Sequence, residues 1–264
     1  MELKEKYTIE DLLEIVTLLR APDGCPWDRA QTHETIKKSM IEEVYETIDA
    51  IDNNDDKMFA NELGDLLLQI ALHAVIAKER DAFDFSVILK EICDKLITRH
   101  THVFGDVKAK DEKDALKTWE ENKKKEKGQK SYSEIISDIP KGLPALMNAE
   151  KVQKKAKSSG FDWQNTDDVF KKLREEIDEL EDAYKNEGVE RIKEEYGDVL
   201  FSMVNLGRFL DVTPETQLLL ATKKFTERFI KMEDMAKNEN TTLDQLSLDE
   251  MDKLWEKAKE KLKK

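Results

Sequence analysis

The sequence predicts an all-α protein made of tandem duplicated helical-bundle domains. The 264 residues include only nine glycines and five prolines, and the alternating β-branched residues that are typical of strands are scarce. Apolar residues instead recur with the period of an α-helix along most of the chain. An acidic motif also occurs twice in the same register, which indicates an internal repeat.

The first half of the chain is expected to form five helices, over residues 8–20, 35–51, 58–80, 85–100 and 113–127. Thr8 is the expected N-cap of the first helix, with Asp11 in the position of a capping box. Residues 21–28, APDGCPWD, are rich in proline and glycine and predict a loop. Residues 52–56 predict a turn, and a polar loop begins at Gly105.

The second half repeats this order after a polar segment. Helices are expected over residues 143–158, 167–187, 189–210, 214–236 and 247–262. The loop Gly160-Phe161-Asp162-Trp163 matches the GCPWD loop of the first half, and Ser247 with Glu250 predicts a capping box. The predicted organisation is an N-terminal domain over residues 1–127, a linker over 128–140, and a C-terminal domain over 141–264.

The most informative stretch is a pair of acidic helices within residues 172–198. The two helices carry Glu175-Glu176-x-x-Glu179 and Glu195-x-x-Asp198, and the segment Asn186-Glu187-Gly188 between them predicts a turn. Glu179 and Glu195 lie eight residues before and after Glu187, and Glu176 and Asp198 lie eleven before and after it. In an antiparallel hairpin, equal steps from the turn give equal heights. The two acidic pairs are therefore expected to face each other.

A hard divalent cation is the expected ligand of these carboxylates. Glu195 and Asp198 belong to a polar stripe on an otherwise apolar helix, so we expect the stripe to face the interior. Four carboxylates placed together repel one another unless they are protonated or neutralised. Oxygen ligands alone favour Mg²⁺ first and Mn²⁺ second.

The same carboxylates recur in the first half. Each precedes its counterpart by 133 residues, and the four are Glu43, Glu46, Glu62 and Asp65. A single EExxE motif is more often a solvated helix face than a site, because this chain is 39% charged. A solvated face has no reason to recur in one register, however. The repetition therefore favours a site, with a possible second one in the N-terminal copy.

Basic and aromatic residues repeat as well. Lys95 and Arg99 share a four-residue spacing with Lys224 and Arg228, and Trp119 and Lys123 share theirs with Trp255 and Lys259. An isolated pair of cations at this spacing is more often a solvated helix edge, and a tryptophan is as often part of a core as a base-stacking platform. Their repetition alongside the acidic motif favours an anionic ligand.

The two copies differ around the carboxylates. Met58 stands in the first copy where Arg191 stands in the second, and Gln69 and Leu72 replace Ser202 and Asn205. The first polar stripe is thus shorter and lacks a cation that could neutralise an anionic ligand. The first copy is expected to bind metal but to be less active, or to serve dimerisation and regulation.

Composition restricts the class of protein. A formal charge of −14, from 58 acidic and 44 basic residues, disfavours nucleic-acid binding through a basic surface. Two cysteines, Cys25 and Cys93, form no disulfide framework, and the N-terminal residues are not a signal peptide, so a cytoplasmic location is expected. No membrane span is expected either, because residues 66–77, the most apolar run, contain Gln69 and His73.

The paired motifs, the GCPWD and GFDW loops and the tandem arrangement resemble the MazG family of all-α nucleoside triphosphate pyrophosphohydrolases. The resemblance covers nearly the whole chain. It implies a helical fold, a homodimer, and Mg²⁺-dependent hydrolysis of nucleoside triphosphates (NTPs) to the monophosphate and diphosphate, with the C-terminal copy as the main catalytic domain. It also implies that Glu176, Glu179, Glu195 and Asp198 hold the metal, and that the nucleotide contacts Lys172, Arg191, Lys224, Arg228, Trp255 and Lys259.

The residue types suit this chemistry independently. A triphosphate carries about four negative charges, which lysine, arginine and a bridging cation can offset. Glu175, or one of the ligands Glu176 and Glu179, is the candidate for orienting or deprotonating the attacking water. Broad specificity for ribo- and deoxyribonucleotides and a role in nucleotide-pool housekeeping are the expectation, because no base-reading motif is found.

Two other functions are open at this stage. One is a non-enzymatic helical module that binds metal or another protein, for which the acidic repeat is only a surface. That module would not need Lys172, Arg191, Lys224 and Arg228 beside the acidic set. The other is a specialised dUTP hydrolase.

Overall fold

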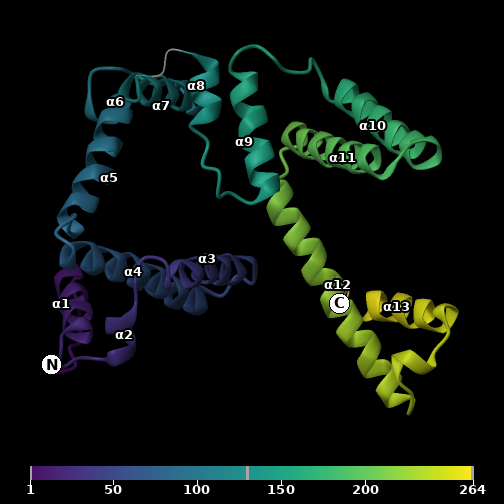
Figure 1. Cartoon of the computed structure of the whole chain (residues 1–264), viewed down its shortest axis with the longest axis horizontal. Helices are drawn as coiled ribbons and strands as arrows, with labels where there is room; N and C mark the ends of the chain where they lie inside the picture. The colour runs from purple at the N-terminus through teal and green to yellow at the C-terminus, as the bar shows by residue number, and fades with distance from the viewer. Residues whose placement is uncertain (1, 129–130, 263–264) are drawn as a thin grey trace. The chain divides into compact units, whose positions relative to one another are not determined.

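The computed structural model describes residues 2–128 and 131–262, and Figure 1 shows helices joined by loops. No strand occurs among these residues, which confirms the predicted all-α class. The chain divides into two compact units, Met1–Lys127 and Gly128–Lys264. Residues 129–130 of the predicted linker, and residues 1 and 263–264 of the two predicted domains, lie outside the described part.

The first unit is built around the hairpin of its two longest helices, α3 and α4. Its helices are α1 (Ile9–Arg20), α2 (Pro26–Ala30), α3 (Lys37–Asp52), α4 (Asp56–Glu79), α5 (Phe85–Arg99), α6 (Thr101–Phe104) and α7 (Glu112–Glu126). α1 packs against α4, and α7 packs against α5. Val16 of α1, Ile36, and Leu72 and Val75 of α4 are buried together in the core of this unit. This packing fixes the hairpin at its apolar end and leaves the acidic end open.

The second unit has a corresponding hairpin, α10 with α11. Its helices are α8 (Tyr132–Ser137), α9 (Ala145–Lys157), α10 (Thr166–Asn186), α11 (Val189–Phe209), α12 (Pro214–Asn238), the 3₁₀-helix η1 (Leu243–Gln245) and α13 (Leu248–Leu262). Val169, Leu173 and Leu206 form a buried cluster at the base of the hairpin. A separate apolar cluster, which includes Met232 and Leu254, joins α12 to α13.

Capping side chains and short turns define where the helices of both acidic hairpins begin and end. The side chain of Asn165 caps the start of α10 by accepting from the backbone N–H of Asp168. Glu187 and Gly188 lie between α10 and α11, as the sequence predicts. In the first unit Asn54 adopts a left-handed conformation with φ 53, and Asp55 caps α4 through the N–H of Met58. These caps set the register in which the carboxylates meet.

Four short helices lie outside the helices that the sequence analysis expects. α2 occurs in the GCPWD loop because Pro26 occupies its first turn, where a missing N–H has no cost. α8 lies within the predicted linker and is stabilised by a capping box between Ser131 and Glu134. α6 and η1 are single turns. Such short segments lack the repeated apolar spacing that predicts a helix.

α4 is apolar enough, by length and composition, to cross a membrane. It is a core helix instead, because Ala71, Leu72, Val75 and Ile76 are buried against the rest of the first unit. The same helix carries Glu62 and Asp65.

Candidate functional site

Three carboxylates meet at the open end of the α10–α11 hairpin. Glu176 and Glu179 of α10 and Glu195 of α11 each offer an oxygen, and these oxygens lie within 4.8 Å of one another. Glu195 is only 2% exposed and Glu176 only 7%, whereas Glu179 is exposed. We call these three residues the second-unit cluster. Carboxylates this close repel one another unless they are protonated or neutralised by a positive charge.

Two basic side chains supply that charge. The Lys172 ammonium lies 2.9 Å from a Glu176 oxygen and 2.7 Å from a Glu175 oxygen. The Arg191 guanidinium forms an ion pair with Glu195 and another, at 2.7 Å, with Glu194. The hydrogen bonds to Glu175 and Glu176 raise the pKa of Lys172, and the bond to Glu194 raises the pKa of Arg191. Both cations therefore remain charged at any physiological pH.

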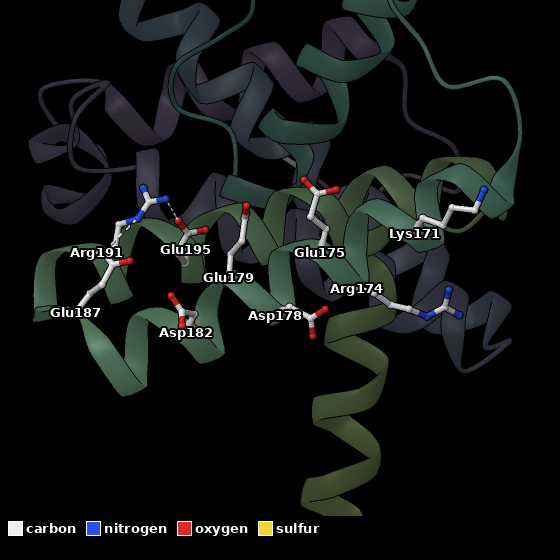
Figure 2. Close-up of a pocket in the computed structure, with 9 residues that line it drawn as sticks. All are labelled: Lys171, Arg174, Glu175, Asp178, Glu179, Asp182, Glu187, Arg191 and Glu195. Atoms are coloured by element: carbon white, nitrogen blue, oxygen red, sulfur yellow. Dashed lines mark ion pairs between the residues drawn. The ribbon is translucent and has the colours of Figure 1, made fainter.

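An open pocket of about 640 Å³ lies over this cluster. It is lined by Lys171, Arg174, Glu175, Asp178, Glu179, Asp182, Glu187, Arg191 and Glu195. Figure 2 shows Glu179 beside Glu195, with Arg191 reaching Glu195 from one side and Lys171 and Arg174 further along α10. Desolvation raises the pKa of Glu179, and the charges of Glu176 and Glu195 add to this shift while Lys172 opposes it. The size of this pocket suits a small charged ligand.

The remaining predicted residues of the second unit do not join the pocket in the described chain. Asp198 is exposed and lies outside the second-unit cluster. Arg228 of α12 lies with its guanidinium carbon 5.8 Å from the ring centroid of Trp255 on α13. Lys259 is paired with Glu256 at 2.9 Å, and Lys224 is exposed on α12. The structure thus brings Arg228 and Trp255 together.

The first unit has a similar cluster made from a different subset of the motif. Oxygens of Glu43, Glu62 and Asp65 lie within 4.8 Å of one another, and Glu62 is buried. We call these three residues the first-unit cluster. Glu46 is exposed and lies outside it. Burial, and then the charges of Asp65, Glu46 and Glu62, raise the pKa of Glu43.

Sequence reasoning missed two features of the second unit. Lys171 and Arg174 line the pocket although no motif includes them, and their only signal is their place on the same helix as Glu175. A buried ion pair also joins Asp162 of the GFDW loop to Arg208 of α11, with Nη1 3.0 Å from Oδ2. Arg208 lies in no repeated motif, so only the fold reveals this contact.

Both acidic hairpins lie within segments that match a known protein family. The model of the MazG nucleotide pyrophosphohydrolase domain matches residues 31–104 and 164–232, so each matched segment contains one acidic hairpin. The chain belongs to the MazG nucleotide pyrophosphohydrolase family. The nucleoside triphosphate pyrophosphohydrolase/pyrophosphatase MazG of Thermotoga maritima is 46% identical over 250 residues, which cover 95% of each chain. The nucleoside triphosphate pyrophosphohydrolase of Escherichia coli K12 is 41% identical over 254 residues, which cover 95% of this chain and 97% of that one.

Membership of the MazG family confirms the resemblance and its enzymatic class. Two matched segments in one chain agree with a tandem helical architecture. Both clusters offer only carboxylate oxygens within coordinating distance of one another, which is the donor set of a hard cation. The protein is a metal-dependent nucleotide pyrophosphohydrolase.

Proposed function

We propose that the second unit carries out Mg²⁺-dependent hydrolysis, with Mn²⁺ as a substitute. The chain is a nucleoside triphosphate pyrophosphohydrolase, and it converts an NTP and water to the monophosphate and diphosphate. The observation that carries the assignment to the second unit is the pocket beside Glu179 and Glu195, because a cation, Arg191, also lines it. A metal-binding surface without a substrate would have no use for that cation.

The cation would be held by Glu176, Glu179 and Glu195, with Asp198 as a fourth ligand if its side chain turns toward them. When bound, Mg²⁺ supplies positive charge that offsets the negative charge on the phosphate oxygens as the α–β bond breaks. A cation held there would neutralise the carboxylates that now pair with Lys172 and Arg191. Both basic side chains would then be available to bind phosphate oxygens.

Other residues complete the proposed mechanism. Glu175, which accepts from Lys172, is a candidate for orienting or deprotonating the attacking water, as are the ligands Glu176 and Glu179. Lys224, Arg228 and Lys259 are proposed to contact the nucleotide. Trp255 is proposed as a stacking surface for the base, because half-buried tryptophan presents a rigid aromatic face.

We further propose that the protein is a homodimer. Many large apolar side chains on the long helices are at least 40% exposed in the single chain; among them are Val87, Ile92, Leu96, Leu200, Phe201, Met203, Phe225 and Phe229. Soluble proteins seldom leave so much apolar surface uncovered. Light scattering on the full chain should give twice the mass of the chain, and an active monomer would contradict the proposal.

The proposed function also includes broad specificity for NTPs and deoxyribonucleoside triphosphates, a role in nucleotide-pool housekeeping and a cytoplasmic location. We propose no membrane or nucleic-acid partner. The test incubates the purified chain with Mg²⁺ and each nucleotide in turn, and identifies the products. Monophosphate and diphosphate from several nucleotides, lost on addition of EDTA, are expected. Activity on dUTP alone would support the specialised hydrolase. Release of a nucleoside diphosphate and orthophosphate would refute the proposed reaction.

A further inference from the structure

Basic and aromatic side chains meet between α5 and α7 in the first unit. The guanidinium carbon of Arg99 lies 5.5 Å from the ring centroid of Trp119, and the ammonium of Lys123 lies 4.9 Å from the same centroid. Two cations beside one half-buried aromatic ring suit an anion that also carries a flat apolar group. We call Arg99, Trp119 and Lys123 the first-unit basic site.

This site already holds an anion, which is a side chain of the protein itself. Glu126, the last residue of α7, accepts hydrogen bonds of 2.8 Å from Nε and 3.0 Å from Nη2 of Arg99. These bonds lower the pKa of Glu126, so its carboxylate is charged at neutral pH. The side chain of Arg99 is only 12% exposed, and its paired donation is the geometry with which arginine also binds a phosphate group.

The corresponding place in the second unit has no such carboxylate. The guanidinium carbon of Arg228 lies 5.8 Å from the ring centroid of Trp255. Leu262 ends α13 seven residues after Trp255, just as Glu126 ends α7 seven residues after Trp119. An alkyl side chain thus replaces the carboxylate. Within the described part of the chain, Arg228 forms no ion pair, so its donors are available to a ligand.

We propose that Glu126 closes the first-unit basic site to nucleotides and thereby decides that the second unit takes the nucleoside triphosphate. The carboxylate occupies the donors of Arg99 that a phosphate group would need, so a phosphate must displace it before binding. The inference rests on the proposed function, since it assumes that Arg228 contacts the nucleotide. If Glu126 served only to join α7 to α5, its removal would lower stability without creating a new site for nucleotide.

The test counts nucleotide sites on the full chain by equilibrium dialysis with Mg²⁺ and α,β-methylene-ATP, an analogue whose α–β bond is not hydrolysed. We expect one site per chain in the natural protein and two in Glu126→Leu, which introduces the residue found at the equivalent place in the second unit. The added site should be the weaker of the two, because Ser39 and Met58 stand in the first unit where Lys172 and Arg191 stand in the second.

Three further variants separate the closing of the site from general effects of charge or packing. Glu121→Leu removes the same charge from the opposite face of α7, at an exposed residue, and should leave one site per chain. Adding Arg99→Met to Glu126→Leu should return the count from two to one, because the phosphate contact is lost. Glu126→Gln preserves the size of the side chain and should also add a site. Circular dichroism checks that each variant is folded.

A reciprocal variant tests the same argument in the second unit. Leu262→Glu introduces a carboxylate at the place that corresponds to Glu126 and should raise KM for an NTP about tenfold, because the carboxylate competes with phosphate for Arg228. Leu248→Glu makes the same replacement at an exposed residue at the start of α13 and should leave KM unchanged.

Three results would overturn the proposal. One is an unchanged number of sites in folded Glu126→Leu and Glu126→Gln at up to about 1 mM nucleotide, the upper end of ordinary KM values. Another is two sites in the natural protein, and the third is an unchanged KM in folded Leu262→Glu. A natural protein that binds no nucleotide would contradict the proposed function instead, and an added site in Glu126→Leu would still support the role of Glu126.

Discussion

Arg191 is the residue whose replacement best imitates the first unit, where Met58 stands at the same position. Its guanidinium pairs with Glu195 and lines the pocket. Arg191→Met should lower kcat/KM about ten- to hundredfold, because a charge-assisted phosphate contact contributes roughly 1.5–3 kcal/mol. Diphosphate release by the purified variant measures this.

Lys185→Met provides the matched control for Arg191→Met. Lys185 is an exposed cation on α10 that, within the described part of the chain, pairs only with Glu181 and does not line the pocket. Its replacement removes one positive charge from the same hairpin and should change kcat/KM by less than about twofold. An equal loss in the two variants would mean that net charge, rather than a contact with the substrate, explains the effect of Arg191.

A pair of histidines is expected to make the stability of the first unit sensitive to pH. His33 and His73 stack, and their Nδ1 atoms lie 2.8 Å apart, so one ring must donate a proton and the other accept it. Burial, and then the charge of His33, lower the pKa of His73 below its ordinary value of 6.5. The stability that neutral His73 contributes is therefore present above that value and lost as the pH falls through the lowered pKa.

The expected result is a lower denaturant midpoint at about pH 5.5 than at about pH 7.5. His73→Gln should reduce this difference, because glutamine does not titrate, while His100→Gln should preserve it. Urea unfolding followed by circular dichroism at the two pH values measures the midpoints. Equal pH dependence in His73→Gln and the natural protein would show that other groups are responsible.

At the scale of elements, each unit fixes a loop to its acidic hairpin with a buried arginine. In the first unit Arg20 of α1 pairs with Glu79 at the end of α4, with a shortest distance of 2.7 Å, and also donates to the carbonyl oxygens of Asp28 and Gln31. In the second unit the arginine is Arg208 of α11, and Asp162 of the GFDW loop is its partner. The two repeats thus reach the same result with residues from different helices.

Asp162→Asn tests the importance of this contact. The side chains of Arg208 and Asp162 are only 7% and 16% exposed, so the variant leaves a buried guanidinium without its counter-charge. We expect a loss of about 3 kcal/mol in the free energy of unfolding, the lower end of the range for breaking a buried ion pair. Chemical denaturation of the full chain measures it, and a change below about 0.5 kcal/mol would contradict the interpretation.

The long helices and the hairpin turns could be predicted because their signals are local. Apolar spacing over α10 and α11, the cap at Asn165 and the Glu187–Gly188 turn all lie within the segments that they define. The Asp162–Arg208 pair could not be predicted, since its partners are 46 residues apart and belong to no motif. The membership of each cluster was also beyond the sequence, because side-chain orientation decides that Glu179 joins its cluster while Glu46 does not.

At the scale of the whole molecule, one acidic motif occurs twice, and the residues beside the two copies differ in charge. The second-unit cluster keeps Lys172 and Arg191, and a pocket opens beside it. The first-unit cluster has the same kind of ligands but Ser39 and Met58 at the basic positions. We therefore propose that the second unit hydrolyses the triphosphate and that the first unit contributes little to hydrolysis.

The most direct test of this division compares two matched variants, Glu176→Gln and Glu43→Gln, by the rate of diphosphate release from an NTP with Mg²⁺. Each replaces the same carboxylate of the motif by an isosteric amide, and circular dichroism verifies the fold. Glu176→Gln should lower the rate about a hundredfold or more, because the site that holds the substrate-bound cation loses a ligand. Glu43→Gln should lower it less than about fivefold, because the change lies outside the hydrolytic unit. The reverse order, or an equal loss in both variants, would contradict the assignment of hydrolysis to the second unit.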